Sequence, residues 1–221
     1  MSYFITGTDT GVGKTLIGCA LLQGFAASGR RVAGFKPVAA GVDADGMNDD
    51  AKALLATSNI PLSYGQVNPY CLHEAIAPHI AASHENIRIE LPRIIAAYRE
   101  LAAKADVVIV EGAGGFLVPL NGKQSVADLA RELGLPVIIV VGMRLGCLNH
   151  ALLTMKAVDD YGVQCAGWIA NVLDGAMPAL RSNIDALRAC ISAPLVGVVP
   201  YMAVPHVRFA AEQIDFRRMD N

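Results

Sequence analysis

Six short hydrophobic segments are spaced along the chain, and longer amphipathic stretches separate them. The six segments are Tyr3–Thr6, Val32–Lys36, Val107–Glu111, Val137–Val141, Ala166–Asn171 and Leu195–Val199. Each is apolar almost throughout, without the alternation of a strand that is exposed on one side. Continuous apolar runs of this length are typical of strands buried on both faces. The pattern therefore predicts a mainly parallel sheet covered by helices.

Helical periodicity is clearest in two of the stretches between these segments. One apolar face is lined by Ile17, Leu21 and Phe25, and another by Leu91, Ile95, Tyr98 and Leu101. Strands and helices that alternate along the whole chain predict an α/β fold, a single doubly wound domain over residues 1–221. The longest interruption, residues 37–90, is rich in proline, glycine and asparagine and has room for two helices. Interruptions of this length in a compact domain usually have a function.

Composition narrows the class of protein. The chain has 221 residues, of which 53% are hydrophobic and 17% charged, as in a compact globular protein. A net charge of −2 gives no general attraction to nucleic acid or to an acidic membrane. No apolar run approaches the roughly 18 residues that a membrane span needs. We therefore expect neither nucleic acid nor a membrane as a partner.

The first residues and the cysteines indicate the compartment. The start, MSYFITGTDT, lacks the basic region and apolar run of a secretion signal. The five cysteines are scattered, with no C-x-x-C pair, which favours reduced thiols. Together these features predict a cytoplasmic protein.

The segment after the first predicted strand, GTDTGVGKT, resembles a phosphate-binding loop with one extra residue. The usual pattern G-x-x-x-x-G-K-[ST] would place its first glycine at Thr8, whereas the glycine is Gly7. Glycines let backbone amides converge on phosphate oxygens; Lys14 would reach the β- and γ-phosphates and the Thr15 hydroxyl would bind Mg²⁺. The alternatives are a glycine-rich turn that binds nothing and a dinucleotide site, whose G-x-G-x-x-G pattern is absent here.

Charged residues follow other predicted strands at the same edge of the sheet. Lys36 ends the second strand and could neutralise charge on a transferring phosphoryl group, or simply be solvated. Glu111 ends the third strand and could anchor Mg²⁺, or be a chance acidic strand end. Asp50 follows a helix cap at Asn48 or Asp49 and could serve the metal, although carboxylates are common at helix starts.

Three later positions suggest ligand contacts. A helix that begins around Asn149 offers free amides that suit a carboxylate, whereas the neighbouring His150 is interpreted as structural. The Asn171 amide could pair with an adenine edge, because it offers one donor and one acceptor group. Pro200 and Tyr201, after the last strand, could flank a base.

Taken together, these segments resemble the dethiobiotin synthetase family, ATP-dependent carboxylases of biotin biosynthesis. The resemblance rests on TGTDTGVGKT, FKPVAAG, NDDAKAL, IAPHIAAS, VVIVEGAGG, LGCLNHALLT, GWIAN and APLVGVVP. These motifs occur in the family's order and span residue 3 to about residue 201. The loop with one extra residue is the family's own form, and the resemblance implies a P-loop NTPase fold.

The resemblance also implies a reaction. 7,8-Diaminopelargonate would react with CO₂ to give a carbamate, ATP would phosphorylate it to a carbamic-phosphoric anhydride, and the second amine would close the ureido ring of dethiobiotin. The products besides dethiobiotin would be ADP and phosphate. The enzyme would use Mg²⁺ and would be a homodimer that binds the substrate carboxylate across its interface.

Site residues follow from the matched motifs. Lys14 and Lys36 would be catalytic, and Thr15, Asp50 and Glu111 would hold the metal. ATP would be bound by Gly11, Val12, Gly13, Lys14, Thr15, Leu16, Asp50, Glu111, Gly112, Ala113, Gly114, Asn171, Pro200 and Tyr201. The substrate would be bound by Thr10, Lys36, Ala40, Pro78 with the neighbouring His79, Leu145, Gly146 and Asn149.

Two positions depart from the family pattern. Relatives often carry a hydroxyl residue where Ala40 stands, so one substrate hydrogen bond is expected to be missing or replaced by water. A larger acidic residue often stands at the position of Gly11, which alters the contacts near the phosphates and the diamine. The stretch after Tyr201 shows little that matches the family, and its role stays open.

Other ATP-binding classes share parts of this pattern. Switch proteins of the partition-ATPase kind resemble the same loop and fold, but they carry a lysine early in the loop where this chain has Asp9. Amide synthetases of corrin biosynthesis need a glutaminase domain, for which 221 residues leave no room. A small-molecule kinase stays possible on the loop alone. Dependence of ATP turnover on the diamine and CO₂ distinguishes these alternatives.

Overall fold

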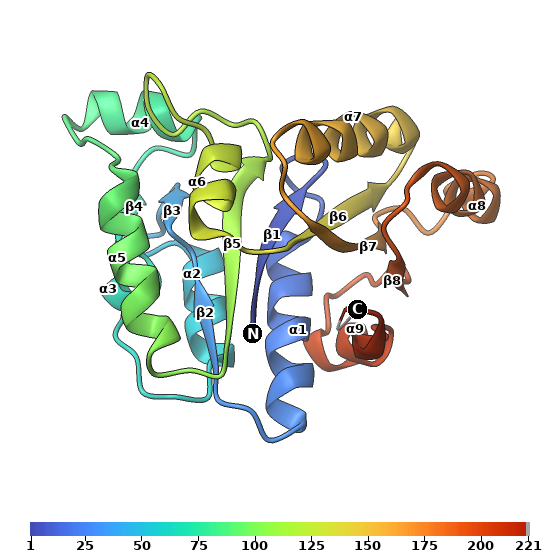
Figure 1. Cartoon of the computed structure of the whole chain (residues 1–221), viewed down its shortest axis with the longest axis horizontal. Helices are drawn as coiled ribbons and strands as arrows, with labels where there is room; N and C mark the ends of the chain where they lie inside the picture. The colour runs from blue at the N-terminus through green and yellow to red at the C-terminus, as the bar shows by residue number, and fades with distance from the viewer. Residues whose placement is uncertain (220–221) are drawn as a thin grey trace.

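The structure, a computed structural model, describes residues 1–219 and has a central six-stranded sheet (Figure 1). The strands are β1 (Ser2–Gly7), β2 (Val32–Phe35), β5 (Val107–Gly115), β6 (Val137–Met143), β7 (Cys165–Val172) and β8 (Leu195–Val199). They lie in the order β2-β5-β1-β6-β7-β8, and every neighbouring pair is parallel. All six predicted strands are confirmed, with ends that differ by a few residues.

Helices cover both faces of the sheet. Successive strand residues point to opposite faces, so Phe4 packs in one hydrophobic cluster while Tyr3 and Ile5 pack in the other. The second cluster includes α1 (Lys14–Ala27), α2 (Asp49–Thr57) and α9 (Val207–Glu212). The first includes α5 (Leu91–Ala102), α6 (Val126–Leu133), α7 (Cys147–Asp160) and α8 (Leu180–Cys190). The expected doubly wound α/β class is therefore confirmed.

The predicted helix faces are largely the observed ones. Ile17, Leu21 and Phe25 are all buried on α1. On α5 the most buried residues are Leu91, Leu101 and, in addition, Ile94. The expected Ile95 and Tyr98 are only partly buried against the same cluster. The face is therefore rotated slightly from the predicted one.

The long interruption holds more structure than the two helices expected. It contains α2, α3 (Tyr64–Val67), α4 (Pro78–His84) and a two-stranded parallel sheet of β3 (Val38–Ala40) with β4 (Tyr70–Leu72). Each strand of this small sheet has three residues, and the pair is separated by a long stretch of chain. Strands that short carry no periodic pattern, and their pairing is decided by the tertiary structure.

The segment after Tyr201 packs along α1 and the edge strand β8. The Asp215 amide donates to the Val196 carbonyl at 2.8 Å, and the Tyr3 hydroxyl donates to the Met219 carbonyl at 3.1 Å. An isolated bridge joins Gly197 to Ile214. The segment thereby covers a strand edge that would otherwise expose unpaired backbone groups.

Gly24 on α1 provides a test of this packing. A Cβ atom added there would lie 2.0 Å from Cζ of Phe216, whose ring meets Phe25 edge-on at 5.2 Å. Gly24→Ala should lower the free energy of unfolding by about 1 kcal/mol, because the clash outweighs a similar gain in helix propensity. In a Phe216→Ala background the same substitution should be stabilising. Urea denaturation of the four proteins measures both effects; stabilisation by Gly24→Ala alone would contradict the packing.

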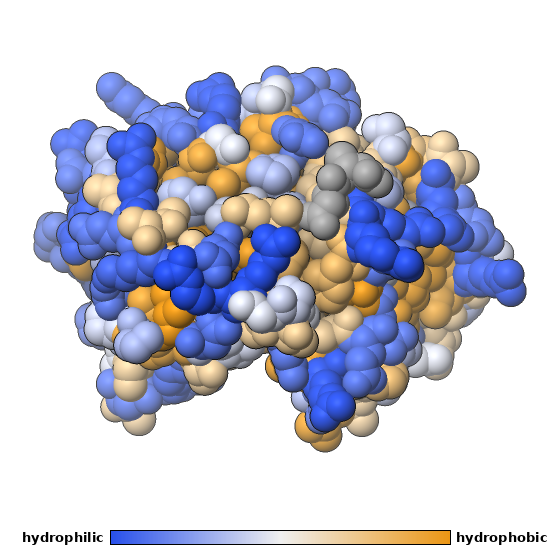
Figure 2. Space-filling view, turned by 60° about the horizontal axis from the view of Figure 1, so that its bottom comes forward, coloured by the Kyte–Doolittle hydropathy of each residue, from blue (hydrophilic) through white to orange (hydrophobic). Residues whose placement is uncertain are grey.

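The surface, the cysteines and the helix lengths are those of an ordinary globular protein. Figure 2 turns the lower end of the molecule toward the viewer, and hydrophilic and hydrophobic residues are interspersed there, as on most globular proteins. All five cysteines lie within the described residues and are free. Among residues 1–219, none of the helices combines the length and the apolar character needed to cross a membrane.

Candidate active site

A cavity of about 660 Å³ opens at the carboxyl ends of β1, β2 and β5. This edge of a doubly wound sheet, next to the point where the strand order reverses, is where such folds bind ligands. The predicted site residues that line it are Thr10, Gly11, Gly13, Lys14, Thr15, Lys36, Ala40, Asp50, Pro78, Glu111, Ala113 and Gly114. Segments far apart in sequence thus bring most of the predicted phosphate, metal and diamine contacts to one cavity.

The loop between β1 and α1 explains the displaced glycine. A Cβ atom at Gly7 would lie 2.6 Å from Cγ2 of Val12, whose buried side chain packs beneath the loop. At the next position the Thr8 hydroxyl accepts from the Gly142 amide at 3.4 Å. Gly13 has a φ of 88°, and a Cβ atom there would lie 2.2 Å from Nδ2 of Asn171. Glycine is therefore required at Gly7 and at Gly13, and the extra residue lies between them.

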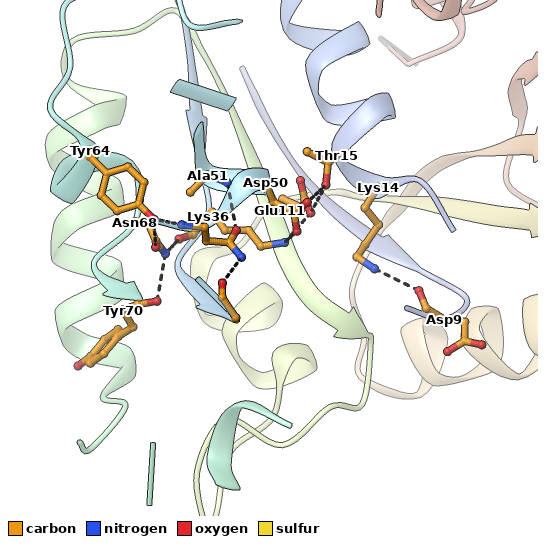
Figure 3. Close-up of polar contacts among 12 residues, drawn as sticks. Asp9, Lys14, Thr15, Lys36, Asp50, Ala51, Tyr64, Asn68, Tyr70 and Glu111 are labelled. Atoms are coloured by element: carbon orange, nitrogen blue, oxygen red, sulfur yellow. Dashed lines mark hydrogen bonds and ion pairs between the residues drawn. The ribbon is translucent and has the colours of Figure 1, made fainter. Parts of the chain in front are cut away.

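A compact charge cluster forms the floor of the cavity (Figure 3). The Lys36 ammonium lies 2.9 Å from Oδ2 of Asp50 and 2.5 Å from Oε1 of Glu111. The Thr15 hydroxyl lies 2.7 Å from Oδ1 of Asp50 and 3.0 Å from Oε1 of Glu111. Lys36 is 4% exposed and Glu111 is fully buried, so water screens their interaction only weakly.

Local structure positions each member of this cluster. Lys36 directly follows β2, and Thr15 lies in the first turn of α1. Asn48 caps α2 by accepting from the Ala51 amide at 3.3 Å, and this fixes the helix turn that carries Asp50. Glu111 was predicted to end its strand. That prediction is wrong, because β5 continues through small residues to Gly115.

The cluster changes the protonation behaviour of its members. Burial disfavours the Lys36 ammonium, but Glu111 and Asp50 outweigh burial and raise the pKa of Lys36. Burial likewise disfavours the Asp50 carboxylate, but Lys36 and the Thr15 hydroxyl lower the pKa of Asp50. The site therefore favours a charged Lys36 ammonium next to a charged Asp50 carboxylate.

A second lysine faces the same cavity. Lys14 is 7% exposed, and its ammonium donates to the Asp9 carbonyl at 3.1 Å. Burial, followed by the charge of Lys36, lowers the pKa of Lys14. The Asp9 carboxylate lies 2.5 Å from Nη2 of Arg144 and accepts from the Thr10 amide at 2.7 Å. Two neighbouring lysines can attract a strongly anionic ligand to this cavity.

The oxygen atoms around Thr15 suit a hard divalent cation. Oε2 of Glu111 is buried and has no hydrogen-bond partner among the described residues, so a cation would satisfy it. Hydroxyl and carboxylate oxygens are ligands that Mg²⁺ prefers, with water and phosphate oxygens completing its coordination. Within residues 1–219, no group of three or more histidine, cysteine or acidic side chains is placed to hold a metal, so this site would rely on two carboxylates and one hydroxyl. The donor set therefore fits Mg²⁺ shared with a phosphate ligand.

Comparison with known proteins assigns the chain to a family. A family model described as an AAA domain matches residues 1–205. The ATP-dependent dethiobiotin synthetase BioD of Aromatoleum aromaticum is 53% identical over 205 residues, which cover 91% of this chain and 91% of the relative. The protein of the same name from Nitrosospira multiformis is 51% identical, covering 98% of this chain and 96% of the relative. The chain belongs to the dethiobiotin synthetase family.

Membership of the dethiobiotin synthetase family confirms the resemblance found in the sequence motifs, and with it the expectation of an ATP-dependent ligase. It also decides among the ATP-binding classes that the phosphate loop alone left open.

Solved structures agree on the fold. A ParA family ATPase from Chlorobium tepidum superposes with a TM-score of 0.59 at 16% identity, covering 100% of this chain and 99% of that chain. The MinD cell division protein of Aquifex aeolicus gives 0.57 at 16% identity, covering 97% and 87%. Similarity at this low identity concerns the fold alone, and it confirms the P-loop architecture.

The predicted adenine contacts lie outside the cavity in this dethiobiotin synthetase family member. Asn171 is 5% exposed, and its Nδ2 donates to the Val12 carbonyl at 2.9 Å, beneath the phosphate loop. Pro200 and Tyr201 follow β8, and the half-exposed Tyr201 ring lies against Gly175. Asn171 thus holds the loop from below, and its contact with adenine stays a prediction.

The predicted carboxylate contacts also lie outside this cavity. The helix α7 begins at Cys147 with Gly146 as its cap, so Asn149 is within the first turn and not at the start. The glycine cap, with a φ of 93°, shifts the start, because a pattern of apolar residues does not reveal a left-handed cap. Leu145, just before the cap, is fully exposed.

Four other predicted positions do not line this cavity. They are Val12, Leu16, Gly112 and His79. Gly112 faces the interior, where an added Cβ atom would lie 3.0 Å from Val126 and 3.1 Å from Phe4. His79 lines a neighbouring cavity together with Ile80.

Some lining residues were not anticipated. The cavity also includes Ala39, Asn48, Val118 and the segment 75–77. Asn48 was predicted only as a possible helix cap. The others are apolar residues in loops or short strands, where no periodic or charge pattern marks them.

Proposed function

We propose that this chain converts 7,8-diaminopelargonate, CO₂ and ATP to dethiobiotin, ADP and phosphate. One observation carries the proposal: Lys14 and Lys36 face the same cavity, beside a phosphate loop and the oxygen cluster of Thr15, Asp50 and Glu111. A carbamate and a γ-phosphate are both anions, and an enzyme that joins them must offset their repulsion. The names of the relatives support ATP as a reactant and dethiobiotin as the product.

In the proposed sequence an amine of the substrate attacks CO₂ and loses a proton, which gives the carbamate. A carbamate oxygen then takes the γ-phosphoryl group, and the bond between the β,γ-bridging oxygen and the γ-phosphorus breaks. The second amine attacks the carbamoyl carbon of the anhydride, loses a proton to solvent and expels phosphate, which closes the ring. In each step negative charge develops on an oxygen, that of the carbamate, of the β-phosphate or of the departing phosphate, so catalysis needs positioning and charge stabilisation but no protein nucleophile.

The lysines divide this work by position. Lys14 follows the phosphate loop, so it would hold the β- and γ-phosphate oxygens of ATP. Lys36 lies across the cavity and would hold the carbamate and the oxygens of the transferring group. Because both ammonium groups are buried, their attraction to these anions is stronger than it would be in water.

Thr15, Asp50 and Glu111 would hold Mg²⁺, which would neutralise charge on the phosphate oxygens. The backbone of residues 11–16 and of 112–114 would surround the phosphates. Thr10, Ala40 and Pro78 would contact the diamine. Without a hydroxyl at Ala40 and a carboxylate at Gly11, this chain would use water or its backbone there.

The remaining assignments extend beyond the cavity. Asn171, Pro200 and Tyr201 would contact the adenine base. In a homodimer, Leu145, Gly146 and Asn149 of one protomer would receive the carboxylate of a substrate bound to its partner. The whole chain, residues 1–221, would act as one domain in the cytoplasm.

Product identification tests the reaction. Purified protein is incubated with MgATP, the diamine and ¹³C-labelled bicarbonate, and the products are analysed by mass spectrometry. We expect labelled dethiobiotin and ADP in equal amounts, and no ADP when either the diamine or bicarbonate is omitted. ADP formed without the diamine would instead indicate a switch-like ATPase, and a phosphorylated diamine without a urea ring would indicate a kinase.

A further inference from the structure

A hydrogen-bonded chain behind the cavity connects the backbone of Lys36 to the cap of α2. It begins at Asn68, which is 3% exposed. Its Nδ2 donates to the Lys36 carbonyl at 2.6 Å and to the Tyr70 carbonyl at 3.0 Å. Asn68 thereby holds the turn between β2 and β3, from which the Lys36 side chain projects.

The chain continues through the hydroxyl of Tyr64 (Figure 3). This hydroxyl donates to Oδ1 of Asn68 at 3.0 Å and accepts from the backbone amide of Asn48 at 2.8 Å. The Cys71 thiol lies 3.3 Å away and can donate to the same oxygen. Burial raises the pKa of Tyr64 to about 12, so the hydroxyl keeps the proton that Asn68 accepts.

The chain ends at the residue that orients Asp50. Asn48 caps α2 through the Ala51 amide, and its Nδ2 donates to the Gly41 carbonyl at 2.8 Å. Asp50 stands two residues further on, in the first turn of the same helix. Lys36 and Asp50 are therefore connected twice. Their side chains form an ion pair in the cavity, and their backbone segments are linked behind it by Asn68, Tyr64 and Asn48.

We propose that Tyr64 and Asn68 are positioning residues that hold Lys36 and Asp50 in the geometry needed for phosphoryl transfer. Neither residue lines the cavity, so each acts through the residues that do. The inference rests on the proposed function of this site. Two charged side chains from different segments must keep their separation while ligands bind, and a rigid connection between their backbones supplies that.

The alternative is that these hydrogen bonds only stabilise the fold. The protein offers a control at another tyrosine, because the Tyr70 hydroxyl accepts from the Glu90 amide at 3.1 Å. Tyr64→Phe and Tyr70→Phe each remove one hydroxyl that accepts from a backbone amide, and both rings stay in place. Tyr64→Phe also leaves Oδ1 of the buried Asn68 without its donor, so it should lower the melting temperature more than Tyr70→Phe does. Only Tyr64→Phe breaks the connection between Lys36 and Asp50.

Steady-state kinetics of dethiobiotin formation distinguish the two roles. We expect Tyr64→Phe to lower kcat about ten-fold, because the hydroxyl that hydrogen-bonds both Asn48 and Asn68 is lost, with little change in the KM for ATP. Tyr70→Phe should keep the wild-type kcat. Asn68→Ser, which shortens the side chain and breaks the contact with the Lys36 carbonyl, should lower kcat at least as much.

Equal kcat values per folded molecule for the two phenylalanine variants would overturn the inference. If Tyr64→Phe folds poorly, Asn68→Ser is compared with Tyr70→Phe in its place, and an unchanged kcat per folded molecule, with folded protein counted by ATP binding, would overturn it equally. A wild-type protein that forms no dethiobiotin would contradict the proposed function instead. The wild-type reaction is therefore measured first.

Discussion

Lys36→Ala is expected to lower kcat for dethiobiotin formation by about 10² to 10³, the usual cost of removing one charge-stabilising group from the reacting atoms. The affinity for ATP should change little, because the phosphate loop and Lys14 stay intact. A loss in kcat without a matching loss in binding identifies an interaction that is made in the transition state. Quenched time courses of dethiobiotin formation measure kcat, and equilibrium titration with ATP measures the affinity.

Lys52→Ala is the matched control for this experiment. Like Lys36, Lys52 forms ion pairs with carboxylates, here the three of Asp43, Asp45 and Asp49, but it lies outside the cavity. Its removal should leave kcat at the wild-type value. Wild-type amounts of dethiobiotin from Lys36→Ala, or equal losses in both variants, would contradict the role given to Lys36.

Glu111→Gln is expected to lower both turnover and stability. The fully buried Glu111 carboxylate is one of two anionic partners of the Lys36 ammonium, and glutamine keeps its shape but removes the charge. Breaking a buried ion pair from one side costs about 3 kcal/mol or more. We expect a loss of that order in the free energy of unfolding, a fall in kcat of about 100-fold and a higher Mg²⁺ requirement, because a metal ligand is weakened.

Denaturation in urea and a Mg²⁺ titration of activity measure these effects. Asp106→Asn provides the comparison, since Asp106 also pairs with a cation, Arg31, but the two side chains are 41% and 60% exposed. An exposed pair of this kind contributes about 0–1 kcal/mol. If Glu111→Gln is no more costly than Asp106→Asn and has the same Mg²⁺ requirement as the wild type, Glu111 is neither a required counter-charge nor a metal ligand.

The strands and the phosphate loop were predictable because their signals are local. A strand buried on both faces must be apolar along its length, and all six such segments became neighbours in one sheet. The Gly-Lys-Thr sequence between a strand and a helix marks the loop equally well. Lys36 was found because it follows a buried strand, and the carboxyl ends of parallel strands share one edge.

Other features required the fold. The β3–β4 pair joins segments about thirty residues apart, and three-residue strands have no pattern of their own. The continuation of β5 past Glu111 through small residues is set by its neighbour β1, where Gly7 pairs with Gly115. The cap of α7 depends on a left-handed Gly146. The hydrogen bonds of Tyr64 and Asn68 join residues whose sequence gives no sign of a shared role.

The sequence by itself determined the fold class, the phosphate loop and the family. Buried strands, glycine-dependent turns and family motifs each depend on residues that are consecutive in the chain. Only the tertiary structure decided that Lys36 lies between Asp50 and Glu111, and that Asn171 supports the loop from below. The physical reason is that hydrogen bonds and ion pairs act over about 3 Å, a separation that sequence distance does not determine. Gly7 shows both levels: the sequence revealed a displaced glycine, and the packing of Val12 explained it.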